Sequence, residues 1–307
     1  MHILSASQFK PEDLTKLFEK ADAFRTMMSS KSGRATLADK HKGYQFCSLF
    51  FEPSTRTRTS FEAAALKIGM GVVSTENASE FSSATKGETI EDTIKVLNEY
   101  DFAAIVIRHP ETGAIGRAAA VSKVPIINGG DGKAEHPTQS LLDMYTIHRK
   151  FKHLDNLHVV IGGDLRYNRT ARSLAKMLSI YPNNKITFVS LKSLQMGDDV
   201  KEILRNSNTE YSEEDNMSAL KTADVVYWNR LQRERIDDGD KDQAIGLIID
   251  SDAVQTMPEN SILMHALPRI DEISVEVDSD PRAYYFEQAG NGLYLRMALL
   301  DEVISAK

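Results

Sequence analysis

Short apolar runs rich in β-forming residues alternate along the chain with segments of helical periodicity, and this alternation restricts the fold more than any other feature. The apolar residues within each run are nearly continuous, as in strands that are buried on both faces of a parallel sheet. Alternation of such strands with helices is typical of α/β architecture. The runs that we predict to be strands are residues 44–51, 71–74, 103–107, 124–127, 157–161, 185–189, 223–228 and 261–265.

The segments between these runs predict helices, and two features suggest a division into domains. The Gly-rich run 129–132 is a natural break, and Pro137 suits the first turn of a connecting helix. We therefore expect two doubly wound parallel-sheet α/β domains joined by helices, residues 1–135 and 136–290, with a helix at 291–307 packing back on the first. The predicted helices are residues 11–28, 57–68, 90–100, 139–150, 169–180 and about 292–305.

Composition excludes several classes of protein. With 37 Lys and Arg against 44 Asp and Glu, the net charge of −7 disfavours a strongly basic nucleic-acid binder. The one cysteine, Cys47, excludes intrachain disulfides and a Cys-based zinc site. No apolar run approaches the roughly 18 residues of a membrane span, and the first residues lack the pattern of a signal peptide. We expect a cytoplasmic protein with no membrane partner.

The most informative segment joins a predicted buried strand to a helix at residues 50–62. The helix begins near Ser54, Thr55, Arg56 and Thr57. Free backbone N–H groups at a helix N-terminus, three hydroxyls and an arginine together make an anion site. A capped helix with a polar first turn explains the same residues, and the pattern alone gives the two interpretations similar weight.

Further polar clusters follow other predicted strands. Arg108-His109-Pro110 follows the strand 103–107, and His136 opens a cluster after the Gly-rich turn. A histidine before proline is more often a cap than a catalyst. Three polar clusters at the carboxyl ends of successive parallel strands nevertheless favour a shared site, because ligands of open α/β sheets bind there.

The motifs in the second half of the chain mainly exclude other kinds of activity. Residues 162–170 form a strand-to-helix turn, but their spacing is not that of a dinucleotide-binding fingerprint, so nicotinamide binding is disfavoured. Residues 230–235 (RLQRER) read alone as a solvated charged loop, and residues 265–269 follow the last predicted strand. No phosphate-binding Walker sequence, nucleophile elbow, zinc-protease motif or other metal constellation stands out.

At this point the residues resemble a known family. Residues 51–58 (FEPSTRTR) resemble the carbamoyl-phosphate signature of aspartate and ornithine carbamoyltransferases, and residues 136–139 (HPTQ) resemble their second shared motif. The resemblance runs through essentially the whole chain. Residues 86–89, 230–235 and 265–269 favour the aspartate branch. One departure is Ala266, where that branch usually has proline, and it bears on the rigidity of the loop.

The resemblance implies transfer of the carbamoyl group from carbamoyl phosphate to L-aspartate, the committed step of pyrimidine biosynthesis. The amine attacks directly, without a covalent intermediate, cofactor or metal. Four groups of residues are implied at the site. Ser54, Thr55, Arg56, Thr57 and Arg108 hold the phosphate; Thr57, Arg108 and His136 polarise the carbonyl oxygen; Gln139 and the backbone of Leu267 and Pro268 hold the carbamoyl NH2; Arg169, Arg230 and Gln232 bind the carboxylates of aspartate.

The resemblance also implies an assembly and a closing motion. Ser82 and Lys86 enter the site from a neighbouring subunit, with Lys86 also reaching aspartate, so the active form is at least a homotrimer with sites in the cleft and at the subunit interface. On closure Glu52 bridges to Arg169 and Arg235. A regulatory chain in a larger assembly stays open. The alternatives are a transcarbamylase for ornithine or another amine, and a catalytically silent scaffold homologue.

Overall fold

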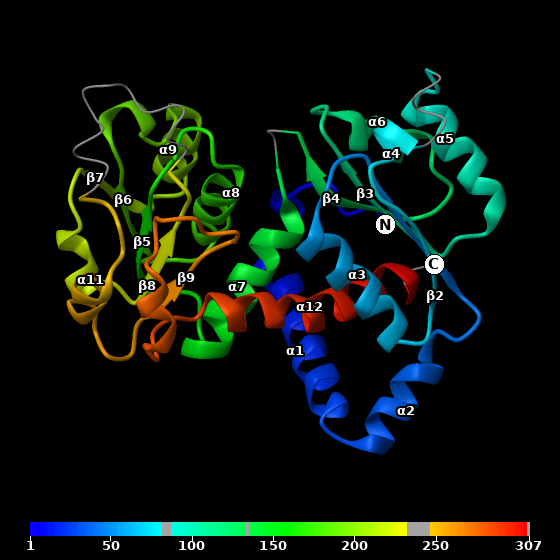
Figure 1. The fold of residues 1–307 in the computed structure, drawn as a ribbon, viewed down its shortest axis with the longest axis horizontal. Coiled ribbons are helices and arrows are strands. Elements are labelled where there is room, and N and C mark those ends of the chain that lie inside the picture. The colour runs from blue at the N-terminus through cyan, green and yellow to red at the C-terminus, as the bar shows by residue number, and fades with distance from the viewer. Residues whose placement is uncertain (82–86, 133–134, 232–245, 306–307) are drawn as a thin grey trace. The chain divides into compact units, whose positions relative to one another are not determined.

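The chain divides into two compact units. The computed structural model describes residues 1–81, 87–132, 135–231 and 246–305. Unit 1 comprises Met1–Leu142 and Gly290–Lys307, and unit 2 comprises Asp143–Ala289. Each unit is built on one parallel β-sheet with helices against it (Figure 1). The predicted fold class, two parallel-sheet α/β domains, is therefore confirmed.

The sheet of unit 1 has four strands in the order β2-β1-β3-β4, and all of its pairings are parallel. Each of them coincides with one of the first four apolar runs to within a few residues. The edge strand β2 is largely exposed, whereas the two central strands are almost wholly buried. The strands are β1 (Gln45–Phe50), β2 (Gly71–Thr75), β3 (Ala104–His109) and β4 (Ile126–Asp131).

Helices cover both faces of this sheet because successive side chains of a strand point to opposite faces. On one face, Phe46 of β1 stacks on Phe61 of α3 (Thr55–Lys67) with ring centroids 6.2 Å apart. On the other face, apolar side chains of β1 and β3 form one buried cluster with Ile94 and Ile115. These two residues belong to α5 (Ile90–Leu97) and α6 (Ala114–Val121), respectively. The short helix α4 (Ala78–Phe81) follows β2.

Two of the three glycines in the run 129–132 lie within a strand. Gly129 and Gly130 belong to β4, where a Cβ on Gly129 would lie 3.1 Å from Val106 and 3.2 Å from the carbonyl oxygen of Ile107. A close approach between strands, and not a linker, explains that glycine. The division between the units falls within α7 (Pro137–Phe151), between Leu142 and Asp143.

The sheet of unit 2 has five parallel strands in the order β7-β6-β5-β8-β9. Four of them coincide with predicted runs. β7 was not predicted, because its sequence EYSEE contains no apolar run; as an edge strand it needs none, since it pairs only with β6. The strands are β5 (His158–Gly162), β6 (Lys185–Val189), β7 (Glu210–Glu214), β8 (Val225–Trp228) and β9 (Ile262–Met264).

The core of unit 2 lies on both sides of this sheet. One buried cluster contains Val160, Val226 and Trp228 together with Leu220 and Tyr285. Helices α8 and α9 pack against one another. Their bounds, with that of the short helix α11, are α8 (Arg169–Leu178), α9 (Asp198–Asn206) and α11 (Ser251–Gln255).

The three helices α1 (Pro11–Met28), α2 (Lys31–Lys40) and α12 (Tyr285–Ser305) carry the main ion-pair cluster of unit 1. Asp301 of α12 is 4% exposed and accepts a hydrogen bond from His41 Nε2 at 2.8 Å. Lys20 and Lys40 each lie 3.1 Å from the same carboxylate. The last helix, expected from about residue 292, begins at Tyr285 because that side chain is anchored in the core of unit 2.

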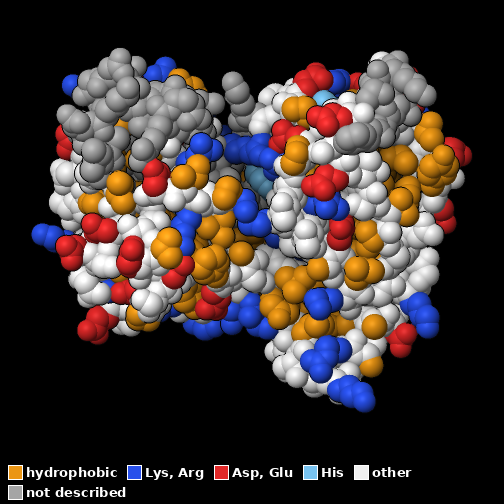
Figure 2. Space-filling model, in the orientation of Figure 1, with side chains coloured by type: hydrophobic (Ala, Val, Ile, Leu, Met, Phe, Trp, Pro, Cys, Tyr) orange, Lys and Arg blue, Asp and Glu red, His pale blue; other side chains and the backbone are white. Residues whose placement is uncertain are grey.

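Acidic and basic side chains are interspersed over the visible face of each unit (Figure 2). This distribution fits a chain whose Lys and Arg nearly balance its Asp and Glu. Among the helices in the described part of the chain, none is long and apolar enough to cross a membrane.

The Asp301 cluster generates a prediction about stability. Burial raises the pKa of Asp301, but the hydrogen bonds from His41, Lys20 and Lys40 outweigh it, and the net pKa lies well below its usual range. Stabilisation by such a carboxylate is complete above its unfolded pKa of about 4 and is lost as the pH falls toward the folded pKa. Asp301→Asn should therefore lower the free energy of unfolding by about 2 kcal/mol at pH 7, and the deficit should shrink below pH 4.

Urea unfolding of the variant and the wild type between pH 3 and pH 7 measures this difference. Asp39→Asn is the matched control, because Asp39 is 74% exposed and lies 3.6 Å from Lys42 on the surface. It should change stability by less than about 0.5 kcal/mol. A deficit of Asp301→Asn that stays constant over this pH range would contradict the role of the charged carboxylate.

Candidate active site

The order of the strands in unit 1 reverses between β1 and β3. From β1 the chain continues to β2 on one side, whereas β3 and β4 lie on the other. Ligands of open α/β sheets bind outside the carboxyl ends of the two strands at such a switch point. The register pairs Phe50, the last residue of β1, with Arg108 of β3. The start of α3, which follows β1, and Arg108 therefore lie at this switch point.

The N-terminus of α3 is open to an anion. Ser54 is the N-cap residue, but its side chain makes no capping hydrogen bond. The first N–H that donates within the helix is that of Arg58, to the carbonyl oxygen of Ser54 at 3.1 Å. The N–H groups of Thr55, Arg56 and Thr57 precede it at the positive end of the helix. Of the two interpretations that the sequence left open, this geometry favours the anion site over the capped helix.

Two guanidinium groups strengthen the site. Partial burial of the Arg56 guanidinium and the positive charge of Arg108 both lower the pKa of Arg56. Two cations that influence one another in this way favour an anion between them. Arg108 Nη2 lies 2.6 Å from Glu52 Oε1, so in this structure a carboxylate of the chain itself accompanies Arg108.

Thr57 and His136 come together in unit 1 although 79 positions separate them. Both side chains are buried, and Thr57 Oγ1 lies 3.2 Å from His136 Nε2. The other ring nitrogen of His136 lies 3.4 Å from Thr138 Oγ1. His136 immediately precedes α7, and Gln139 stands in the first turn of that helix. Hydroxyl and imidazole groups can thus meet a ligand oxygen beside the anion site.

His109 does not join this group. Its Nδ1 accepts a hydrogen bond from the N–H of Glu111 at 3.1 Å, and its ring packs against Phe51 with centroids 4.7 Å apart. It holds the turn after β3. The sequence cluster of Arg108 and His109 did not distinguish the side chain that lies at the switch point from the one that stabilises the turn.

Unit 2 has its own switch point, between β5 and β8. Arg169 is the first residue of α8, the helix that follows β5, and Arg230 lies two residues beyond the end of β8. Both arginines are half-buried. Planar guanidinium groups at the carboxyl ends of neighbouring strands suit the recognition of carboxylates.

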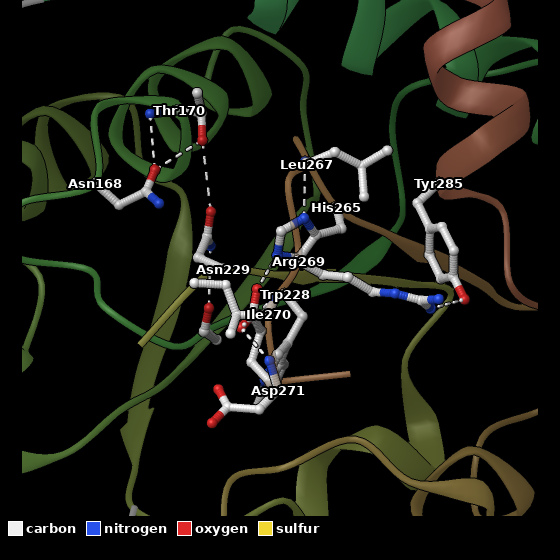
Figure 3. A network of polar contacts seen from close by, with 12 residues as sticks. Asn168, Thr170, Trp228, Asn229, His265, Leu267, Arg269, Ile270, Asp271 and Tyr285 are labelled. Atoms are coloured by element: carbon white, nitrogen blue, oxygen red, sulfur yellow. Dashed lines mark hydrogen bonds and ion pairs between the residues drawn. The ribbon is translucent and has the colours of Figure 1, made fainter. Parts of the chain in front are cut away.

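A polar network fixes the backbone from which these two arginines project (Figure 3). Asn168 Oδ1 accepts from the N–H groups of Thr170 at 3.0 Å and Ala171 at 3.2 Å, which caps α8. Thr170 Oγ1 donates to Asn229 Oδ1 at 3.4 Å, and Asn229 Nδ2 donates to the carbonyl oxygen of Gly162 at 3.0 Å. The start of α8 and the ends of β5 and β8 are thereby tied together.

Gly162 has a packing role and not a phosphate-binding role. A Cβ at this position would lie 2.0 Å from Cζ3 of Trp228, whose ring is completely buried. The glycine therefore allows the aromatic ring of β8 to lie against β5.

The loop after β9 carries Leu267 and Pro268, which are joined by a cis peptide bond. Leu267 is half-buried and Pro268 is exposed, whereas His265 at the start of the loop is buried. Sequence reasoning did not identify the residues that support this loop, Glu272, Asp278, Tyr285 and Gln288. An acidic residue in the polar segment after the proline was the available signal for Glu272, but nothing in the sequence indicated its burial.

Four predicted site residues lie outside the described part of the chain. Among the residues that the structure describes, no three or more His, Cys, Asp or Glu side chains lie together in a group that could hold a metal ion. The four residues are Ser82, Lys86, Gln232 and Arg235.

Two parallel-sheet units with arginines at their switch points define an α/β protein whose strand ends suit small anions. Comparison with known proteins gives the particular family. Residues 1–149 match the family model described as the aspartate/ornithine carbamoyltransferase carbamoyl-P binding domain, and residues 155–303 match its Asp/Orn binding domain. The chain belongs to the aspartate/ornithine carbamoyltransferase family.

Individual relatives agree with this result. The chain is 47% identical to aspartate carbamoyltransferase 1, chloroplastic, of Pisum sativum, over 98% of this chain and 78% of the relative. It is 39% identical to the aspartate carbamoyltransferase catalytic subunit of Clostridium novyi, over 100% and 98% of the two chains. The catalytic subunit of M. jannaschii aspartate transcarbamoylase superposes with a TM-score of 0.92 at 36% identity, covering 100% of this chain and 98% of that one.

A structure with a bound inhibitor is also similar. Aspartate transcarbamoylase from Trypanosoma cruzi in complex with N-(phosphonacetyl)-L-aspartic acid superposes with a TM-score of 0.90. The two chains are 37% identical, and the match covers 98% of this chain and 95% of the other.

The contact of Gly162 with Trp228 generates a prediction. Gly162→Ala should lower the free energy of unfolding of unit 2 by about 1–3 kcal/mol, because the added methyl group overpacks a buried ring. Trp228 is the one tryptophan of the chain, so its fluorescence during urea unfolding reports directly on this contact. Gly116→Ala is the control: Gly116 lies in α6 with open space around its Cβ position, and the change should be neutral or stabilising. Equal stability of Gly162→Ala and wild type would contradict the packing role.

Proposed function

We propose that this protein is an aspartate carbamoyltransferase that converts carbamoyl phosphate and L-aspartate to N-carbamoyl-L-aspartate and phosphate, the committed step of pyrimidine biosynthesis. The observation that carries the proposal is the pair of arginine-bearing switch points, one in each unit, which suits two anionic substrates. Its similarity to a Trypanosoma cruzi aspartate transcarbamoylase whose structure holds carbamoyl phosphate and aspartate supports the same assignment.

Unit 1 binds carbamoyl phosphate in this proposal. The phosphate lies at the N-terminus of α3, where the N–H groups, Ser54, Thr55 and Arg56 hold its oxygens together with Arg108. The carbonyl oxygen faces Thr57, Arg108 and His136. These donors stabilise the negative charge that develops on this oxygen when the amine attacks. The hydrogen-bond distance of 3.2 Å between Thr57 and His136 supports a common target for the two side chains.

Unit 2 binds aspartate. Arg169 and Arg230, with Gln232, pair with the two carboxylates and orient the amine. Gln139 and the backbone carbonyl groups of Leu267 and Pro268 accept hydrogen bonds from the carbamoyl NH2. The amine nitrogen then attacks the carbonyl carbon, the bond from that carbon to the phosphate oxygen breaks, and the departing phosphate takes the proton of the amine. The reaction needs no covalent intermediate and no cofactor.

Glu52 links binding to closure. In this structure it pairs with Arg108 at 2.6 Å. A bound phosphate dianion competes for the same guanidinium and releases Glu52, which then pairs with Arg169 and Arg235 when both substrates are present. The exchange makes closure depend on the first substrate.

The assembly in this proposal is a homotrimer whose sites are shared. Ser82 and Lys86 of one subunit reach the carbamoyl phosphate of its neighbour, and Lys86 also reaches aspartate. The support is the motif resemblance over the whole chain. The cytoplasmic location expected from the sequence stays a prediction, since several plant relatives are named as chloroplastic proteins.

The choice of amine tests the function. Purified chain should convert carbamoyl phosphate with L-aspartate and should be at least about 100-fold less active with L-ornithine. The reason is that Arg230 would face the cationic side chain of ornithine in place of the side-chain carboxylate of aspartate. Colorimetric detection of the ureido product with each amine measures this ratio. Turnover with ornithine would assign the chain to the other branch of the family. Folded, assembled chain that uses neither amine would favour the scaffold alternative.

Hybrid assemblies test the shared sites. Arg56→Ala removes a charged partner of the phosphate, and Lys86→Ala removes the ammonium group that the neighbouring subunit supplies to the site. Each variant alone should therefore retain less than about 1% of the activity. A mixture reassembled from dissociated subunits should regain activity, because some sites combine an intact Arg56 with an intact Lys86. A mixture of Arg56→Ala with Arg108→Ala is the control and should regain none, since both lesions lie in the same half of the site. No recovery in the first mixture, despite verified subunit exchange, would contradict sharing.

A further inference from the structure

His265 holds the loop after β9 through both of its ring nitrogens. Nδ1 accepts a hydrogen bond from the backbone N–H of Leu267 at 2.7 Å (Figure 3). Nε2 lies 2.9 Å from Glu272 Oε1. The side chains of His265 and Glu272 are only 3% and 0% exposed, respectively. Because Nδ1 accepts, it bears no proton, and the proton of the neutral ring lies on Nε2, facing Glu272.

Glu272 ties this histidine to the other limb of the loop. Its second oxygen, Oε2, accepts from the N–H groups of Ile270 and Asp271, each at 3.2 Å. Burial raises the pKa of Glu272, but the hydrogen bonds from His265 and from the backbone outweigh it, and the net pKa is lowered. The group is therefore a carboxylate, whose Oε2 accepts from the backbone and whose Oε1 faces Nε2 of His265 as a close polar neighbour.

The base of the loop is fixed from two further directions. The N–H of His265 donates to Gln288 Oε1 at 2.9 Å, and Gln288 Nε2 donates to Asp143 Oδ1 at 2.6 Å. Arg269 pairs with Asp278 and also donates to the hydroxyl of Tyr285 at 2.8 Å.

At the tip of the loop, the side chain of Leu267 packs against the buried apolar cluster of unit 2. Leu267 has a φ of +54°, a left-handed conformation that a leucine adopts only when its surroundings enforce it. Residue 266 is alanine, which does not restrict the backbone as a proline would. The packing of the Leu267 side chain and the hydrogen bond from its N–H to His265 together hold this conformation, and the hydrogen bond orients the backbone of the tip.

We propose that Glu272 is a positioning residue that acts through His265. By fixing the proton on Nε2 it keeps Nδ1 as an acceptor for the N–H of Leu267, and so aims the carbonyl groups of the tip at the NH2 of the carbamoyl group. This inference rests on the proposed function, which assigns the tip to that NH2. The inference goes beyond the proposed function because it makes Glu272 responsible for the preference of the site for a ligand with an amide group over bare phosphate.

Glu272→Gln tests the mechanism because it keeps the shape of the side chain. An amide has one acceptor oxygen where the carboxylate has two. If the NH2 of the glutamine faces His265, the ring must carry its proton on Nδ1, and the hydrogen bond from the N–H of Leu267 is lost. If the NH2 faces the backbone instead, the N–H groups of Ile270 and Asp271 lose their acceptor. A buried hydrogen bond is lost in either orientation.

The readout is binding of two probes by calorimetry, so that it does not depend on turnover. Phosphonoacetamide carries both a phosphonate and an amide NH2, whereas inorganic phosphate carries no NH2. Glu272→Gln should weaken the binding of phosphonoacetamide about 10-fold or more and the binding of phosphate less than about 2-fold, since only the first probe contacts the loop. A general loss of structure would weaken both probes together.

Two comparisons sharpen the test. Glu276→Gln makes the same chemical change at an exposed residue of the following segment and should leave both affinities unchanged. His265→Asn places an amide oxygen where Nδ1 was and can still accept from Leu267, so it should bind phosphonoacetamide more tightly than His265→Ala does.

Three results would overturn the inference. They are equal weakening of both probes by Glu272→Gln, no weakening of either, and wild-type protein that binds phosphonoacetamide no more tightly than phosphate. Failure of the proposed function is separate, because it appears as absence of turnover in wild-type protein with the first probe still bound more tightly.

Discussion

The reversal of strand order within each parallel sheet is the constraint on which the rest of this structure depends. In unit 1 it falls between β1 and β3, and in unit 2 between β5 and β8. At such a point the connections on either side depart in opposite directions, so the strand ends are not covered by a crossover. The helix that follows the first strand also points its N-terminus at the opening. Topology therefore creates two places that suit a ligand before any side chain is considered.

Side chains then make these openings specific. The chain carries a net charge of −7, yet Arg56 and Arg108 give the switch point of unit 1 a locally positive field. A half-buried guanidinium without a counter-charge is costly, and Glu52 supplies that charge in the structure described here. Binding of an anion then exchanges one negative partner for another. Such an exchange costs less than the desolvation of an unpaired cation would.

The sequence predicted most of what depends on local pattern. Continuous apolar runs located eight of the nine described strands, and the motifs at residues 51–58 and 136–139 led to the residues that lie at the switch point of unit 1. β7 was missed because an edge strand with the sequence EYSEE needs no apolar run. α2 was missed because only Leu37 of its ten residues is buried, too little for a periodic signal.

What could not be predicted depends on contacts distant in sequence. The packing of the Trp228 ring against Gly162 joins residues of two different strands, and the spacing of residues 162–170 gave no indication of it. His109 and Arg108 are neighbours in the chain, but only their different partners separate a turn residue from a site residue. The burial of Glu272 is likewise a property of the packed loop, since the acidic and apolar residues around it in the sequence do not distinguish it from the partly exposed Asp271.

The burial of Glu272 beside His265 calls for an explanation other than stability. Removing a carboxylate from water costs free energy, so its burial is weak evidence for a contribution to folding. A hydrogen-bonded carboxylate does what an apolar side chain cannot, because it selects one tautomer of a neighbouring histidine. In this loop the selected tautomer accepts the N–H of Leu267, the residue with the left-handed backbone. The cost of burying a charge is thus offset by a defined backbone conformation at the tip, which is the element that must be held in place if its carbonyl groups are to recognise a ligand.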